Sequence, residues 1–88
     1  MTIKHYGYGH IPAGICGTTV DIYTYTFGIK YRKYKATVYI KNNMLTGTIY
    51  DDTKSVVYKE EYTYNKPYPN TKEIRTILFY LVMDFINR

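Results

Sequence analysis

Residues 33–50, KYKATVYIKNNMLTGTIY, decide the fold of this chain. Apolar and polar side chains alternate on both sides of Asn42-Asn43, a period of two that is typical of strands with one buried face. Asn tolerates positive φ better than most residues do, so the two asparagines favour a two-residue hairpin turn. A turn at this point pairs each apolar residue with an apolar or small partner: Ile40 with Leu45, Val38 with Gly47, and Ala36 with Ile49.

Strand patterns on both sides of this hairpin extend it to a β-meander. Residues 18–27 place Tyr23, Tyr25 and Phe27 on one face, and Gly28 is expected to end or bend that strand. The last strand is expected to carry Val56, Tyr58, Tyr62 and Tyr64 on one side, with a β-bulge or an overhanging end at Glu60. We therefore expect about four antiparallel strands, over residues 18–27, 33–41, 44–50 and 55–64.

The N-terminal segment, residues 4–19, is rich in glycine and reads KHYGYGHIPAGICGTT. Such a density of glycine, together with Pro12, favours irregular structure over a continuous strand. We expect a loop-like segment here, with a short strand at residues 2–6 at most.

A single helix is predicted at the C-terminal end, over residues 71–87. Asn70 and Glu73 have the spacing of a capping box, in which the Asn oxygen accepts a hydrogen bond from the third helical amide. The main apolar stripe, which should lie on one face of the sheet, consists of Ile74, Ile77, Leu78, Leu81 and Phe85. The sequence therefore predicts an α+β fold, with residues 1–88 as one small domain.

A second apolar band runs beside that stripe, formed by Phe79, Val82, Met83 and Ile86. One helix on one small sheet normally needs a single apolar stripe, so part of this band is expected to be exposed. Either the N-terminal segment covers it, or it makes a contact with a partner or with a second copy in a homodimer.

Composition limits the classes of protein that the chain can represent. The 88 residues are 45% hydrophobic, which is ordinary for a globular protein, and they contain 13 Tyr but no Trp. The longest apolar run, residues 77–83, is far shorter than the roughly 20 residues that a membrane helix needs. A lone Cys16 and an N-terminus without an apolar signal region favour the cytoplasm, which would be the host cytoplasm for a phage protein.

The net charge of +5 is concentrated in residues 30–41, which contain five bases and no acid. Bases and aromatic residues alternate there, a mixture that on a sheet face can bind phosphates while Tyr stacks on nucleic-acid bases. The residues that we expect to make such contacts are Lys30, Tyr31, Arg32, Lys33, Lys35, Tyr39 and Lys41. The alternative is an edge strand that its lysines protect against edge-to-edge pairing.

No catalytic, metal or cofactor site is predicted. His5, His10 and Cys16 include types of residue that bind zinc, but the closely spaced ligand pairs that give zinc motifs their specificity are missing. Cys16 with either His would be a nucleophile and a base, yet the sequence shows neither a helix start nor an electropositive pocket to activate the thiol. We expect the protein not to be an enzyme and to have no cofactor.

In size, composition and architecture the chain resembles the short proteins of phages and other mobile elements, among them anti-CRISPR proteins. The resemblance implies a non-enzymatic inhibitor that blocks a surface of a host or defence protein or a ribonucleoprotein. The alternative is a nucleic-acid-binding protein that uses the basic, Tyr-interleaved hairpin at residues 30–41.

Overall fold

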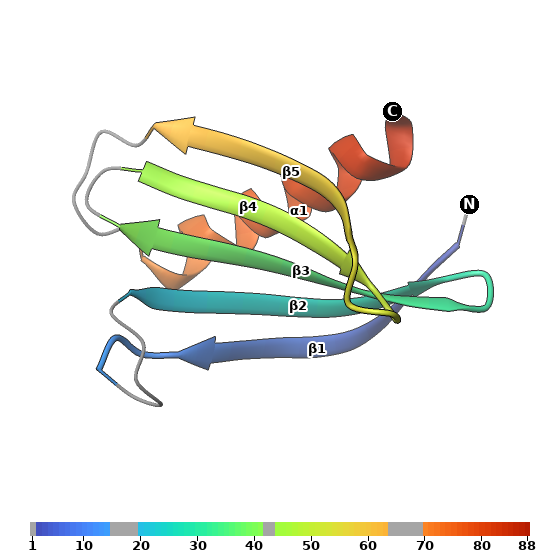
Figure 1. Cartoon of the computed structure of the whole chain (residues 1–88), viewed down its shortest axis with the longest axis horizontal. Helices are drawn as coiled ribbons and strands as arrows, with labels where there is room; N and C mark the ends of the chain where they lie inside the picture. Colours follow the sequence, from blue (N-terminus) through green and yellow to red (C-terminus); the bar gives the residue numbers. More distant parts are fainter. Residues whose placement is uncertain (1, 15–19, 42–43, 64–69) are drawn as a thin grey trace.

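Five antiparallel strands in one sheet and one helix make up the part of the chain that the computed structural model describes, residues 2–14, 20–41, 44–63 and 70–88 (Figure 1). The strands follow one another in space in chain order, so the sheet is a simple meander. Their bounds are β1 Ile3–Ile11, β2 Asp21–Ile29, β3 Arg32–Lys41, β4 Met44–Asp51 and β5 Val56–Thr63, and the helix is α1 Thr71–Asn87. The predicted α+β fold is confirmed, with one strand more than expected.

The central β3–β4 hairpin has the register that the sequence predicts. Ile40 pairs with Leu45, Val38 with Gly47, and Ala36 with Ile49, while Asn42-Asn43 lie outside the described residues. The apolar members of these pairs are buried, and Phe27 of β2 joins them from the neighbouring strand. Local alternation and a short connection were sufficient to predict this pairing.

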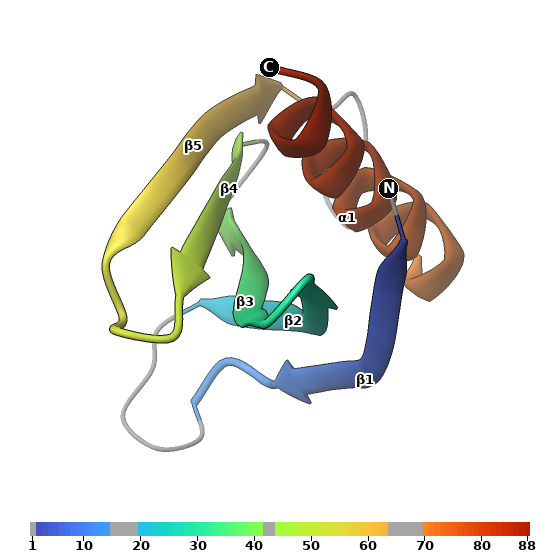
Figure 2. The same ribbon diagram turned by 90° about the vertical axis from the view of Figure 1, so that its right-hand side faces the viewer.

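The helix α1 lies against β2, β3 and β4, on the concave side of the curled sheet (Figure 2). Ile74, Leu78 and Leu81 of its main stripe are almost fully buried. Its first turn is capped as predicted, since Oδ1 of Asn70 accepts from the amide of Glu73 at 2.8 Å. Among the residues that the structure describes, no helix combines the length and apolarity needed to span a membrane.

The N-terminal segment is not the irregular loop that its glycines suggested. Residues Ile3–Ile11 form β1, which pairs with β2 along its length, apart from a β-bulge between His5 and Gly7. Gly7 has a φ of 152°, a conformation that other residues rarely adopt, and Figure 2 shows β1 changing direction near its middle. The glycine thus bends an edge strand, where sequence reasoning expected it to prevent one.

The second strand is longer at its C-terminal end than predicted. β2 continues through Gly28 to Ile29, which pairs with Arg32, and a two-residue turn at Lys30-Tyr31 leads into β3. Lys30 has a φ of 57°, the left-handed conformation that tight hairpin turns require. The first predicted residues of this strand, 18–19, lie outside the described part of the chain.

The bulge in β5 lies at Val57, where Glu60 had been expected to cause it. Tyr50 pairs with Val56 and Ile49 with Tyr58, so Val57 is the extra residue. The bulge reverses the orientation of Val56, which is 56% exposed instead of sharing a face with Tyr58 and Tyr62. Tyr64, the fourth residue predicted for that face, is outside the described residues.

Glu60 remains in register because its carboxylate is satisfied on the helix-facing side of the sheet. It lies opposite Gly47, which has no side chain to compete for the space, and its Oε2 accepts from the hydroxyls of Tyr58 at 3.1 Å and Tyr62 at 3.0 Å. Burial, followed by the hydrogen bond to Glu60, raises the pKa of the Tyr62 hydroxyl, which keeps that donor protonated. A charged residue is thereby accommodated in β5 without a bulge at its own position.

Gly47 sets how closely α1 approaches the sheet. A Cβ at this position would lie 3.0 Å from both methyl carbons of Leu81 and 3.3 Å from the Tyr62 ring. We predict that Gly47→Ala destabilises the fold by about 1–3 kcal/mol through overpacking. Leu81→Ala should cost about 2–5 kcal/mol, because Leu81 is fully buried.

The double variant distinguishes this contact from two independent effects. Gly47→Ala combined with Leu81→Ala should cost clearly less than the sum of the single changes, as urea unfolding of all four proteins would show. Additive costs would mean that Gly47 and Leu81 do not determine the spacing between helix and sheet.

Candidate binding surface

The convex face of the sheet, on the side away from α1, has no described element packed on it (Figure 2). We call it the open face. The strand register turns toward it the residues that alternate with the core positions, and its lysines come from β1, β3 and β5: Lys4, Lys33, Lys35, Lys41 and Lys59. Among the described strand residues, Glu61 is the one acid on this face. The open face is therefore strongly basic.

The structure divides the basic residues that the sequence predicted to act together. Lys33, Lys35, Tyr39 and Lys41 lie on the open face, on alternate positions of β3. Lys30 and Tyr31 form the exposed tip of the β2–β3 hairpin. These two residues lie at one end of the face instead of within it.

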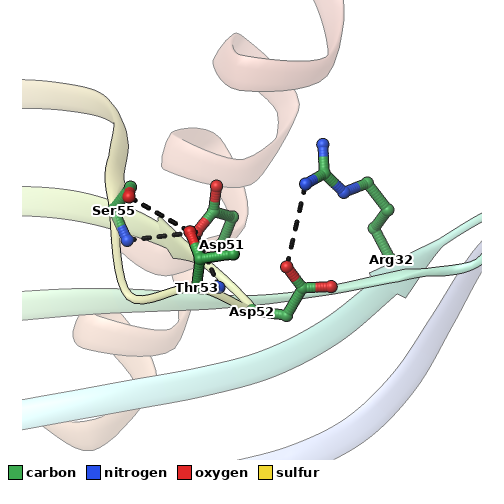
Figure 3. Close-up of polar contacts among 5 residues, drawn as sticks. All are labelled: Arg32, Asp51, Asp52, Thr53 and Ser55. Carbon is green, nitrogen blue, oxygen red and sulfur yellow. Dashed lines mark hydrogen bonds and ion pairs between the residues drawn. The ribbon is translucent and has the colours of Figure 1, made fainter.

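Arg32 differs from the lysines because its charge is already paired. It sits on the helix-facing side of β3, opposite Ile29, and its Nη2 lies 3.8 Å from Oδ1 of Asp52 (Figure 3). Asp52 belongs to the β4–β5 turn, a pairing across two strands that the sequence did not reveal. Arg32 was predicted as a contact residue, but it does not lie on the open face.

Tyr6 of β1 was not predicted from the sequence as a contact residue, yet on the open face it contacts two lysines and a glycine. Its ring packs on Gly28, where a Cβ would come within 3.1 Å of a ring carbon. The Nζ atoms of Lys4 and Lys33 lie 5.4 and 5.0 Å from the ring centroid, within the range of cation–π contacts. The side chain is 45% exposed, so part of the ring, with two ammonium groups over it, is accessible to a ligand.

Two shallow depressions meet on the open face along β3. One, of about 430 Å³, lies over β1 and β2, and the other, of about 480 Å³, extends to the β4–β5 turn. Both are lined by Thr26, Lys33 and Lys35, so together they form a continuous groove, which we call the lysine groove. Tyr6 lines its β1 end and Tyr50 lines its β4 end.

Tyr39 and Tyr50 form a polar aromatic cover beside the lysine groove. Their hydroxyls are hydrogen-bonded at 3.2 Å, across the pair formed by Thr37 and Thr48. Those threonines are 3% and 4% exposed although no described element packs on this face, which the two rings above them explain. The hydrogen bond to Tyr50, followed by burial, raises the pKa of Tyr39 to about 12, so its hydroxyl adds no negative charge to the face at neutral pH.

The second apolar band of α1 is mostly covered. Val82 is 3% exposed and belongs to the core, while Met83 and Ile86 are partly buried. Ile3, His5 and Tyr8 of β1 lie beside the band around a small cavity of about 60 Å³, so the N-terminal segment does cover part of it. Phe79 remains 57% exposed, and a homodimer contact through it stays a prediction.

The histidines of β1 face the helix side of the sheet and are engaged by neighbouring tyrosines. His5 is hydrogen-bonded through Nδ1 to the Tyr25 hydroxyl, and the His10 ring stacks on Tyr23 with centroids 4.0 Å apart. Cys16, the third residue weighed as a metal ligand or nucleophile, lies outside the described residues. Within the described ranges, no group of three His, Cys, Asp or Glu side chains is placed to hold a metal ion.

The β4–β5 turn borders the lysine groove and is organised by one carboxylate (Figure 3). Oδ1 of Asp51 accepts from the Thr53 hydroxyl at 2.6 Å and from the amides of Thr53 and Ser55 at 2.9 and 3.0 Å. The Thr53 hydroxyl, followed by the Ser55 amide, lowers the pKa of Asp51 because both donors favour the charged carboxylate. Asp51 is thus committed to the turn instead of to a ligand.

Comparisons of the chain with models of protein families, with curated proteins and with solved structures found no match.

The lowered pKa of Asp51 predicts how stability depends on pH. A carboxylate whose pKa is lower in the folded state stabilises the fold above its unfolded pKa, about 3.9, and this contribution disappears as the pH falls through the folded pKa. Asp51→Asn should therefore be less stable than the wild type at pH 7, and the difference should shrink below about pH 4. Urea unfolding between pH 2 and pH 7 measures it; a difference that stayed constant at low pH would contradict this role.

Proposed function

We propose that this protein is a non-enzymatic binding protein that presents the open face of its sheet to a negatively charged surface of a macromolecular partner. The observation that carries the proposal is the accumulation of lysines from three strands on a face where Glu61 is the one described strand acid. Complementary charge accelerates association and selects partners. The open face combines this charge with tyrosine side chains, which are well suited to binding interfaces.

The open face is large enough for a specific contact. The two longer extents of the molecule are 36 and 27 Å, so a complex that uses most of this face can reach the roughly 800 Å² per partner of a standard interface. A rigid sheet also loses little conformational entropy when it binds, because its backbone is already ordered. Simple coverage of a functional surface would then be sufficient for activity, without any chemical step.

Within this proposal the protein is an inhibitor that blocks a host or defence protein or a ribonucleoprotein in the host cytoplasm. Support for this class comes from its small size, from its α+β fold and from its resemblance to phage proteins such as the anti-CRISPR group. A basic face is repelled by an empty nucleic-acid channel, which is itself basic. The open face suits an acidic protein surface or a channel that already contains its nucleic acid.

Direct binding of nucleic acid is the second candidate function. The specific observation in its favour is the contact of Lys4 and Lys33 with the Tyr6 ring, because base stacking and phosphate contacts can then occur at one place. It requires no protein partner, whereas the inhibitor does.

Reversal of one charge on each side of the molecule tests the use of the open face. We predict that Lys35→Glu, in the lysine groove, abolishes retention of the partner in a pull-down from host extract. Lys72→Glu makes the same change in charge in the first turns of α1, away from the open face, and should retain the partner as the wild type does. Equal retention by both variants, or a loss confined to Lys72→Glu, would show that the open face is not the contact surface.

A further inference from the structure

We infer that the anionic surface recognised by the open face is a single strand of nucleic acid, held in the lysine groove with one base against Tyr6. This inference rests on the proposed use of the open face and deepens the second candidate function, since it names the partner of the same face. It goes further because it assigns separate roles to the lysines and to the aromatic ring. Four features of the groove support it.

The lysines are spaced to follow a phosphate backbone. Lys33 and Lys35 occupy alternate positions of β3 and turn the same way, so their stems start about 6.7 Å apart along the strand. Neither lysine forms an ion pair with a carboxylate, because the ion pairs among the described residues join His10 to Asp21 and Arg32 to Asp52. Two ammonium groups in line, without an internal counterion, suit successive phosphates of an extended strand.

The aromatic ring distinguishes nucleic acid from an acidic protein surface. Carboxylates of a protein would be satisfied by the lysines alone and have no need of an exposed ring between them. Tyr6 lies on Gly28, and the Nζ atoms of Lys4 and Lys33 lie over its ring, so a base that displaces these ammonium groups from the ring leaves them close enough to bind its own phosphates. Stacking of this kind tolerates any base, because every base has a π-face.

The shape of the sheet favours a single strand over a duplex. The open face is convex, because the sheet curls around α1 on its other side (Figure 2). A duplex is stiff over roughly 150 base pairs and would touch a convex face only along a line, whereas a flexible strand can follow it. The faces of paired bases are also covered by their neighbours, so only an unpaired base can stack on Tyr6.

The groove is lined with hydroxyl groups that suit a nucleic-acid backbone. Thr24 and Thr26 of β2 line it beneath the lysines, and Tyr50 lines its other end. Hydroxyls donate to phosphate oxygens and accept from sugar hydroxyls without adding charge. Asp51 and Asp52 also line the end of the groove at the β4–β5 turn, where Asp51 is hydrogen-bonded within the turn and Asp52 is paired with Arg32. Away from that end, the groove offers ammonium groups, hydroxyls and one exposed ring from β3 to β1.

Fluorescence anisotropy with defined probes tests this inference. The probes are a labelled single strand of about 12 nucleotides as DNA and as RNA, the matching DNA duplex, and labelled poly-glutamate. The full-length protein should bind both single strands, and bind them more tightly than the duplex or poly-glutamate. Its affinity should fall as salt increases, and Lys35→Ala should reduce the slope of log K against log salt by about 0.7.

Tyrosine variants separate stacking from charge. Tyr6→Leu removes the ring but keeps an apolar side chain against Gly28, and it should weaken strand binding roughly five- to a hundredfold at an unchanged salt slope. Tyr6→Phe should bind as the wild type does. The matched control is Tyr80→Leu, which removes an exposed tyrosine of α1, on the other side of the sheet, and should leave affinity unchanged. Circular dichroism confirms that each variant is folded.

The alternative outcomes separate this inference from the proposed function. Equal binding of poly-glutamate and single strands, with no effect of Tyr6→Leu, would overturn the inference and leave a face for acidic protein surfaces. Tighter binding of the duplex would overturn the single-strand assignment alone. Absence of binding to every polyanion at low salt would overturn the inference and the proposed function together.

Discussion

The packing of one helix on one side of a curled sheet is the constraint on which the rest of this structure depends. Leu78 and Leu81 of α1 are seated on the concave side, against core residues such as Leu45 and Ile49. A chain of 88 residues has room for a single hydrophobic core of this kind. Because the apolar side chains are concentrated on the concave side, the residues of the convex side are not needed for the core and can serve in binding.

Those residues are lysines, threonines and tyrosines. Contacts among their side chains stabilise the open face, on which no described element packs. Tyr39 and Tyr50 shield the threonines between them, and Tyr6 covers Gly28. The alternative interpretation of the lysines in residues 33–41, as protection of an edge strand, is wrong, because β3 is the middle strand and pairs with β2 and β4 on its two sides. These lysines lie on the open face instead, where their like charges repel a second copy of the same face and attract an anion.

Interactions between neighbours in sequence were predictable, and interactions between distant residues were not. The β3–β4 register follows from alternation about Asn42-Asn43, and the helix start follows from Asn70 and Glu73. β1 was missed because its stability comes from the hydrogen bonds to β2, a separate strand farther along the chain. Its glycines, read locally, indicate a loop. The bulge at Val57 likewise depends on how β5 meets β4.

The candidate surface was predictable only in part, for the same reason. Alternation in residues 33–41 places Lys33, Lys35 and Lys41 on one face, as the sequence suggested. The contribution of Tyr6 depends on the pairing of β1 with β2, and the loss of Arg32 depends on the β4–β5 turn. A signal for Tyr6 did exist in the spacing of Lys4 and Tyr6, but Gly7 and Gly9, which follow them, indicated a loop.

The most direct test of this account is a map of the bound surface by NMR, from the amide shifts of the labelled protein during titration with a single-stranded oligonucleotide. The account predicts that shifts change in β1, β2 and β3, around Tyr6, Thr26 and Lys35, while the amides of α1 near Phe79 stay in place. Changes confined to the exposed side of α1, with the open face unaffected, would contradict it.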